Sequence, residues 1–256
     1  MKIKNSYLPQ ANEVQVFEHA AQNFLPVLIK GPTGCGKTHF IEHMSDRLNR
    51  PLITVACHDD LTATDLVGRH LIGKDGTYWQ DGPLTRAVRQ GAICYLDEVI
   101  EARKDTTVVL HPLSDHRRAL PIERTGEEIQ AHPNFMLVVS GYQNVMKGWK
   151  PSTRQRFVAL EFNYPSPERE VVIVCQESNI DKETAQKLVN LGLDLRRLKD
   201  HDLEEAASTR LLIYTAKMIL SGLDPKQACM ACLALPLSDE TNTINAIARL
   251  VQVYFP

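Results

Sequence analysis

The residues with the clearest chemistry lie in one short segment, Gly31 to Thr38, which reads Gly-Pro-Thr-Gly-Cys-Gly-Lys-Thr. Glycines let successive backbone N–H groups turn toward one anion, and a lysine and a hydroxyl residue follow them. An apolar run precedes the segment and a helical pattern follows it. The alternative is a glycine-rich turn without a ligand, but the flanking elements favour a phosphate-binding P-loop.

The last two residues of this loop have expected roles in binding ATP and Mg²⁺. Lys37 is expected to reach the β- and γ-phosphates, and the hydroxyl of Thr38 to bind the metal ion. The positive end of the following helix adds to the attraction for phosphate. We therefore expect the nucleotide to be held by Gly31, Pro32, Thr33, Gly34, Cys35, Gly36, Lys37 and Thr38.

Two adjacent carboxylates farther along the chain supply the second half of a hydrolytic site. An apolar run that includes Ile93-Cys-Tyr-Leu ends on Asp97 and Glu98. Asp97 suits the Mg²⁺ ion, and Glu98 suits the base that orients and polarises the attacking water. The alternative is that both carboxylates merely cap the next turn. Together with the P-loop, the pair predicts an ATPase that forms ADP and phosphate.

The composition limits the class of protein. The chain has 256 residues, of which 43% are hydrophobic and 23% charged, as in ordinary soluble globular proteins. A formal net charge of -2 argues against a nucleic-acid partner bound through a bulk basic field. We expect no membrane span, because no apolar run approaches the roughly 20 residues of a membrane helix. The scattered cysteines and the missing signal sequence indicate a cytoplasmic protein.

Five apolar runs alternate with helical patterns in the first part of the chain. They are continuous rather than alternating, which is typical of strands buried on both faces of a sheet. We expect an α/β fold whose parallel five-stranded sheet has helices on both faces. The expected strands are Val27–Lys30, Leu52–Ala56, Ala92–Leu96, Phe135–Ser140 and Phe157–Phe162.

A proline-rich break at residues 164–170 predicts the boundary between two domains. The expected domains are an α/β core over residues 1–164 and a small helical lid domain over residues 165–256. Two stretches interrupt the core, at about 71–82 and about 117–132, and the second has the pattern of a β-hairpin. In the helical part, Arg196, Arg197 and Lys199 are expected to form a solvated helix face.

Longer strings of the sequence extend the interpretation beyond the P-loop. Besides the loop, they are residues 55–68, 81–88, 150–157 and 200–210. These strings resemble the AAA+ ATPases of the MoxR branch and, within them, the CbbQ/NirQ/NorQ family, whose branches share them. In overall look the chain is most similar to CbbQ. The resemblance covers nearly the whole chain. It implies an AAA+ ring, usually a homohexamer, with nucleotide bound between subunits.

The resemblance also implies roles for three arginines. Arg156 matches the arginine finger, which would stabilise charge on the γ-phosphate of the neighbouring subunit. Arg154 is the second candidate for that role. Arg210 resembles the sensor-two arginine of the lid, which contacts the nucleotide. A surface ion pair is the alternative for each of them.

Other segments of the family pattern have expected places as well. The stretch at about 71–82 matches the helix-two insert, and that at about 117–132 the pre-sensor hairpin, which face the pore or the client. Tyr78 and Trp79 either contact the client or pack locally. His58, Asp59 and Asp60 have metal-ligand chemistry, but we expect a structural or interface role for them.

One departure from the family pattern concerns the γ-phosphate sensor. The family ends its fourth strand on Asn-Pro before Gly-Tyr-Gln, whereas Ser140 here runs directly into Gly141. Ser140, Gln143 or Asn144 could take the place of the missing asparagine. The other interpretation is that a few residues of this loop are absent from the sequence.

The resemblance implies a motor that remodels a client protein. The CbbQ-like interpretation is a Rubisco activase subunit that releases inhibitory sugar phosphates together with a von Willebrand factor A (VWA) domain partner, CbbO. The alternative is a NorQ- or NirQ-like ATPase that matures or activates nitric oxide reductase. A third hypothesis is a small-molecule kinase that uses the same P-loop; the Asp97–Glu98 pair and the helical domain fit hydrolysis in a ring better.

Overall fold

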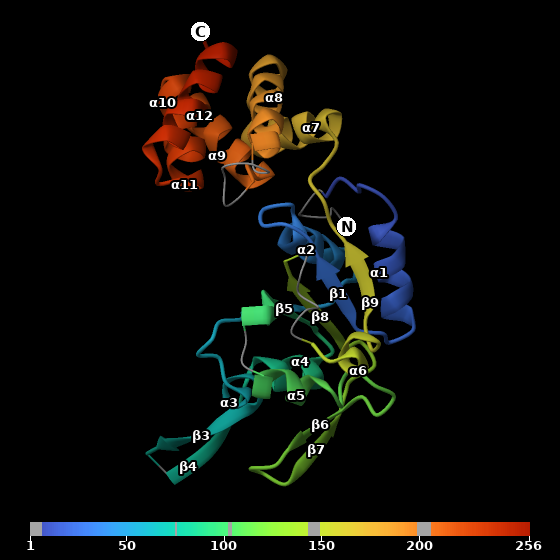
Figure 1. Ribbon diagram of the computed structural model, residues 1–256. Helices are drawn as coiled ribbons and strands as arrows, with labels where there is room; N and C mark the ends of the chain where they lie inside the picture. Colours follow the sequence, from blue (N-terminus) through green and yellow to red (C-terminus); the bar gives the residue numbers. More distant parts are fainter. Residues whose placement is uncertain (1–6, 75, 102–103, 143–148, 199–205) are drawn as a thin grey trace. The chain divides into compact units, whose positions relative to one another are not determined.

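The computed structural model describes residues 7–74, 76–101, 104–142, 149–198 and 206–256. These residues form two compact units (Figure 1). The α/β unit runs up to Gly31 and continues over Lys37–Phe162. The helical unit comprises Asn163–Pro256 together with the loop segment Pro32–Gly36. The tip of the P-loop thus groups with the helical unit, and its two ends belong to the α/β unit.

A five-stranded sheet in the order β2-β5-β8-β1-β9 forms the centre of the α/β unit. Every neighbouring pair in it is parallel, which confirms the predicted fold class. The strands begin and end within one residue of the expected runs. Their bounds are β1 Val27–Lys30, β2 Leu52–Ala56, β5 Ile93–Asp97, β8 Met136–Gly141 and β9 Val158–Glu161.

Burial explains why the apolar runs form this sheet. All six residues of β8 are buried, and β5 is buried up to Leu96. Strands buried on both faces need cover from helices, which the α/β unit supplies. Its helices are α1 Glu13–Gln22, α2 Lys37–Leu48, α3 Ala63–Val67, α4 Pro83–Gln90, α5 Lys104–Leu110, α6 Pro151–Arg154 and the 3₁₀ turn Val99–Glu101. The sequence interpretation had not included α1.

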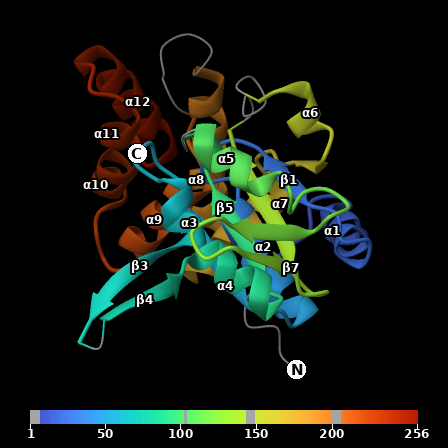
Figure 2. The same cartoon turned by 90° about the horizontal axis from the view of Figure 1, so that it is seen from below.

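Two β-hairpins extend from the α/β unit. The first consists of β3 Gly68–Gly73 and β4 Gly76–Asp81, and the second of β6 Ala119–Ile122 and β7 Glu127–Gln130. Both extend below the central sheet in Figure 1, and Figure 2 shows the β3–β4 hairpin projecting to one side. The first hairpin is an antiparallel strand pair that overlaps the stretch expected at about 71–82 but begins three residues earlier, at residue 68.

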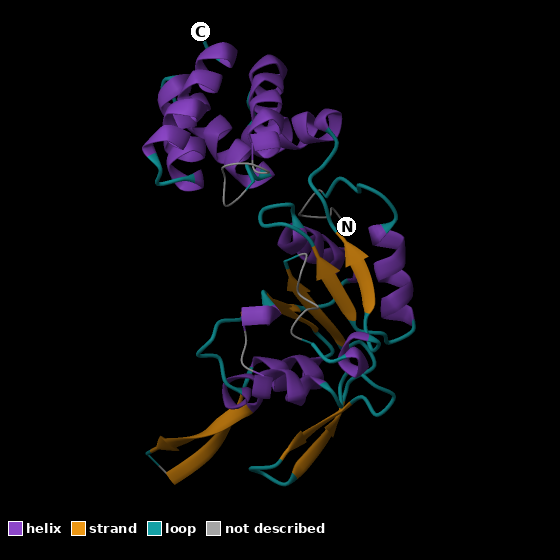
Figure 3. Ribbon diagram, in the orientation of Figure 1, coloured by secondary structure: helices purple, strands orange, loops and turns teal. Residues whose placement is uncertain are grey.

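The helical unit contains no strand among its described residues (Figure 3). Its core gathers buried aliphatic side chains, among them Val174, Leu188, Leu212 and Ile247. Its elements are α7 Pro167–Ser178, α8 Lys182–Leu198, α9 Thr209–Leu220, α10 Pro225–Cys229, a π-helical turn Met230–Ala234, α11 Leu235–Leu237 and α12 Thr241–Tyr254. Across the part of the chain that the structure describes, no helix has the length and apolarity needed to cross a membrane.

Candidate functional site: the phosphate loop and the acid pair

The phosphate loop follows β1 directly, in the context that the sequence predicts. A Cβ on Gly31 would lie 2.5 Å from the carbonyl oxygen of Phe162, so this position has room only for glycine. Gly34 has φ +69°, and a Cβ there would lie 2.6 Å from the Ser208 side chain within the helical unit. These two glycines are therefore required by close packing and, at Gly34, by backbone conformation as well.

Lys37 and Thr38 occupy the first turn of α2, where the end of the loop aims them toward the sheet edge. Lys37 Nζ donates a hydrogen bond to the Gly31 carbonyl oxygen over 3.0 Å. Thr38 Oγ1 donates to Asp97 Oδ2 over 3.4 Å, across 59 residues of sequence. Thr38, which the sequence assigns to the metal ion, thus lies beside Asp97 of the predicted acid pair, and Lys37 precedes it in the same turn of α2.

Asp97, at the carboxyl end of β5, is held by two buried hydroxyl groups. Tyr95 Oη donates to Asp97 Oδ1 over 2.7 Å, and Ser140 Oγ donates a short bond to the same oxygen. The two hydroxyl oxygens lie 3.0 Å apart. Burial and the Asp97 charge hold the pKa of Tyr95 well above its usual range, so the phenol remains a donor. Asp97 Oδ2 keeps its contact with Thr38.

Glu98 follows Asp97 at a backbone position that is uncommon for a residue other than glycine. Its φ is +54°, and its N–H donates to Ser140 Oγ over 3.3 Å. The side chain is exposed. In a regular strand, consecutive side chains such as those of Asp97 and Glu98 point to opposite faces. The left-handed backbone at Glu98 ends β5 at Asp97, so strand alternation no longer sets the direction of the Glu98 side chain. Such backbone positions recur at functional sites.

The donor set beside the loop fits a magnesium ion. Thr38 offers a hydroxyl oxygen and Asp97 a carboxylate oxygen, which are the hard ligands that Mg²⁺ prefers. Proteins often hold Mg²⁺ through one or two such groups, with waters and substrate phosphates completing the shell. Burial, and after it the charges of Asp97 and Glu98, raises the pKa of the Cys57 thiol to about 12.

The two arginines considered for the finger both have partners within the chain. Arg156 donates to Asp115 Oδ2 over 2.8 Å and to the His111 carbonyl oxygen over 2.9 Å. Hydrogen bonds from Arg117, and then from Arg156, hold the pKa of Asp115 well below its usual range. Arg154 donates to the Trp149 carbonyl oxygen over 2.8 Å. The finger role of Arg156 remains a prediction.

Arg210 lies in the first turn of α9 and is exposed. Within the helical unit, its Cβ would be 3.3 Å from a Cβ placed on Gly34 of the phosphate loop. The arginine that the resemblance assigns to the nucleotide thus lies close to the tip of the loop.

The expectation of a solvated face on α8 is wrong for one arginine. The Arg196 side chain is only 12% exposed and binds the fully buried Glu170. Arg197 is 81% exposed, as expected, and pairs with Asp194. Lys199 lies outside the described residues. The sequence could not separate the two adjacent arginines, because Glu170 is on another helix.

The candidates for the missing sensor residue are only partly described. Ser140 ends β8 against Asp97 and the Glu98 backbone, whereas Gln143 and Asn144 lie outside the described residues. Tyr95 had been missed altogether. Its spacing of two residues from Asp97 in a strand was a usable signal, since residues i and i+2 share a face.

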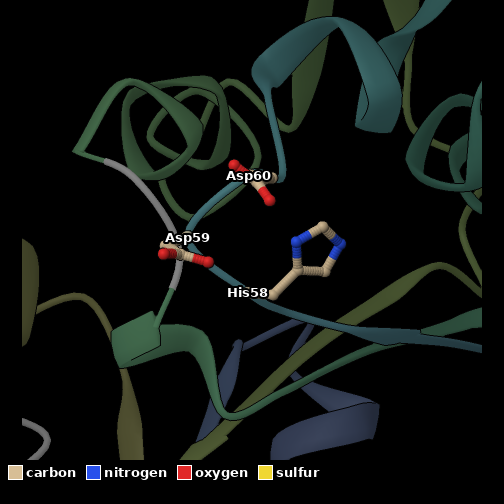
Figure 4. A group of neighbouring side chains, drawn as sticks. All are labelled: His58, Asp59 and Asp60. Carbon is tan, nitrogen blue, oxygen red and sulfur yellow. The ribbon is translucent and has the colours of Figure 1, made fainter.

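The loop after β2 carries His58, Asp59 and Asp60, which are all exposed (Figure 4). Their potential ligand atoms lie within 4.8 Å of one another. Three exposed groups on one loop do not define a metal site, so the structural or interface role of His58, Asp59 and Asp60 stays a prediction.

On the first hairpin, the two aromatic residues differ in burial. Trp79 packs against the core, whereas Tyr78 is 52% exposed.

Comparisons with known families identify the class of protein. The family model described as AAA domain (dynein-related subfamily) matches residues 26–157. The solved structure of the Thermotoga maritima RuvB Holliday junction branch migration motor has a TM-score of 0.56 and 13% identity, and the match covers 93% of this chain and 67% of that one. That likeness supports the fold alone. The chain is an AAA protein.

A family model that matches the C-terminal part of the chain, and relatives that match nearly all of it, identify the family within the AAA proteins. The model of the CbbQ/NirQ/NorQ C-terminal family matches residues 170–254. Denitrification regulatory protein NirQ of Stutzerimonas stutzeri is 65% identical over 97% of this chain and 92% of its own length. The chain belongs to the CbbQ/NirQ/NorQ family.

The sequence identities to two further relatives show which branch of this family the chain resembles more. Protein NorQ of Paracoccus denitrificans is 59% identical, and the match covers 97% of this chain and 93% of its own. Protein CbbQ of Hydrogenophilus thermoluteolus is 51% identical over the full length of both chains. The predicted family is confirmed, but the specific similarity to CbbQ and its Rubisco role are not. The NirQ and NorQ alternative fits better.

Proposed function

We propose that this chain is a Mg²⁺-dependent ATPase that hydrolyses ATP to ADP and phosphate in a homohexameric ring. The observation that carries the proposal is the convergence of Lys37, Thr38, Asp97 and Glu98 at one end of the sheet. Lys37 and the loop hold the phosphates, and Thr38 and Asp97 hold the metal ion. Glu98 orients the attacking water. Arg156 completes the site of the neighbouring subunit, and Arg210 contacts the nucleotide.

Replacing the proposed base tests the hydrolytic part. Glu98→Gln keeps the size of the side chain but removes its basicity, so turnover should fall at least about a hundredfold while nucleotide still binds. Phosphate release and binding of a fluorescent ATP analogue measure the two effects. Glu101→Gln, the same change three residues away, is the matched control. Turnover of Glu98→Gln at the rate of the unaltered protein would contradict the assignment.

For the client, the function best supported is activation or maturation of nitric oxide reductase, together with a VWA-domain partner in the cytoplasm. The support is the higher identity to NirQ and NorQ, 65% and 59%, than to CbbQ, 51%. One of these relatives is named a denitrification regulatory protein.

A reconstitution with both clients distinguishes the two branches. Purified chain, VWA partner and ATP should raise the activity of immature nitric oxide reductase and should not release sugar phosphate from inhibited Rubisco. Glu98→Gln in the same mixture controls for the need for hydrolysis. Release from Rubisco without an effect on nitric oxide reductase would reverse the proposal in favour of the CbbQ-like role.

A further inference from the structure

A buried ion pair lies at the meeting point of three helices in the helical unit. Glu170, in the first turn of α7, is 0% exposed and accepts two bonds from Arg196 of α8, over 2.6 and 2.8 Å. Thr209 of α9 donates to the same carboxylate over 2.6 Å. The three helices pack against one another (Figure 1). A buried carboxylate with this many donors is fixed in position.

The same arginine also binds the chain immediately before α9. Arg196 Nε donates to the Ala207 carbonyl oxygen over 2.7 Å. Arg196 therefore holds residue 207 directly and residue 209 through Glu170. These two positions flank Ser208, the N-cap of α9, whose side chain accepts from Leu211 N–H. Hydrogen bonds thus hold the chain at residues 207 and 209, on both sides of the N-cap of α9, and Arg210 follows directly.

Two contacts connect this cluster to the phosphate loop, within the same unit. The guanidinium of Arg196 lies 4.2 Å above the ring of Tyr164, and Tyr164 Oη donates to the Thr33 carbonyl oxygen over 3.1 Å. Ser208 lies against Gly34 so closely that a Cβ on Gly34 would be 2.6 Å from it. The cluster therefore reaches the phosphate loop at two points, at Thr33 through Tyr164 and at Gly34 through Ser208.

We propose that Arg196 is a positioning residue of the ATPase site, which places Arg210 at the phosphate loop through its contacts with Glu170, Ala207 and Tyr164. Arg196 does not touch the nucleotide itself. The planar fork of arginine binds one carboxylate through two bonds and stacks on an aromatic ring, and lysine can do neither as well. This inference rests on the proposed contact between Arg210 and the nucleotide.

The test measures how well the protein distinguishes a triphosphate from a diphosphate. The test takes the contact of Arg210 to be with the γ-phosphate, the group that ADP lacks. A displaced Arg210 should therefore weaken binding of a non-hydrolysable ATP analogue and leave ADP binding nearly unchanged. We expect Arg196→Lys to raise the Kd for the analogue by about three- to tenfold and that for ADP by less than about twofold. The adjacent, exposed Arg197→Lys is the matched control, with both values unchanged.

A second pair of variants leaves both charges of the buried Arg196–Glu170 pair in place. Thr209→Val keeps the shape of the side chain but removes its bond to Glu170, and the Arg196–Glu170 pair remains intact. It should show the same selective loss for the ATP analogue, and Thr209→Ser, which keeps the hydroxyl, should restore binding. A general loosening of the helical unit would instead weaken both nucleotides together and lower the thermal midpoint.

Arg210→Ala, measured in the same way, separates failure of the inference from failure of the proposed function. If Arg210→Ala weakens the ATP analogue selectively but Arg196→Lys and Thr209→Val do not, the positioning role is overturned and the role of Arg210 stands. An equal loss for both nucleotides in these two variants overturns it too. If Arg210→Ala does not weaken the ATP analogue more than ADP, the proposed role of Arg210 is wrong, and the positioning role of Arg196 is then wrong as well.

Discussion

Asp97 is the residue on which most of the hydrogen bonds at the end of β5 converge. Thr38, Tyr95 and Ser140 all donate to its two oxygens. Loss of a group that orients a metal ligand in this way typically lowers metal affinity or activity by roughly 10- to 100-fold. Ser140 has a second task, because it also accepts the N–H of Glu98. One hydroxyl therefore fixes both members of the acid pair.

Removal of this hydroxyl should impair hydrolysis more than nucleotide binding. We expect Ser140→Ala to lower turnover roughly 10- to 100-fold and to raise the Mg²⁺ concentration needed for half-maximal activity. Binding of ADP without metal should stay within about twofold, because the phosphate loop is untouched. Steady-state phosphate release across a Mg²⁺ titration measures the effect.

Ser45→Ala provides the control for Ser140→Ala. It also removes a buried hydroxyl, which donates to the Arg50 carbonyl oxygen over 2.7 Å, in the same α/β unit. Its turnover and Mg²⁺ requirement should match those of the unaltered protein. Equal turnover in Ser140→Ala and Ser45→Ala would show that Ser140 does not orient the acid pair.

At the scale of elements, the parallel sheet brings the ends of β1, β5 and β8 to one edge. Carboxyl ends of neighbouring parallel strands meet there, which is where α/β proteins bind ligands. The loop after β1, the acids of β5 and Ser140 of β8 meet for this reason. The β3–β4 hairpin is a separate element, and its two aromatic residues have different surroundings.

Trp79 and Tyr78 should differ in their effect on stability. Trp79 packs against the core, and its indole N–H donates to Asp81 over 2.8 Å, so Trp79→Ala should lower the free energy of unfolding by about 2–3 kcal/mol. Tyr78 points to the other face of the strand, and Tyr78→Ala should change it by less than about 0.5 kcal/mol. Urea denaturation of both variants measures the difference. An equal loss in the two would mean that the hairpin packs differently.

For the whole molecule, the proposed ring requires that one subunit complete the site of the next. Arg156 is held by Asp115 and the His111 carbonyl within its own chain, and its side chain is 29% exposed. An arginine side chain that already has two hydrogen-bond partners is restricted to one orientation. It therefore loses little conformational entropy when it binds a phosphate. The pairing with Asp115 is thus compatible with a finger, although it is equally what a structural arginine would show.

Mixed rings distinguish a finger from a structural arginine. We expect Arg156→Ala to lower turnover roughly a thousandfold, and the inactive Glu98→Gln subunits to restore part of it when mixed in. The restored sites would combine Glu98 of one subunit with Arg156 of its neighbour. The same mixture with Arg154→Ala tests the second candidate. If turnover stays at the sum of the separate proteins, Arg156 does not act across the interface.

The sequence alone determined the strands, the P-loop and the acid pair. These features are local: an apolar run buried on both faces, a glycine pattern between strand and helix, and two carboxylates at a strand end each occupy a few consecutive residues. The family strings added the class of protein but could not separate its branches, and the preference for CbbQ over NirQ and NorQ came from the overall look of the chain. That preference had no support in any single residue, and the identities over the full chain did not confirm it.

The tertiary structure decided which side chains share a site. Tyr95 and Ser140 meet at Asp97, Asp115 holds Arg156, and Arg196 is buried on Glu170 while its neighbour Arg197 is solvated. Apart from Tyr95 and Asp97, these partners are separated by 26 to 45 residues along the chain. Periodicity describes which face of one element is buried, whereas a contact depends on how two elements pack.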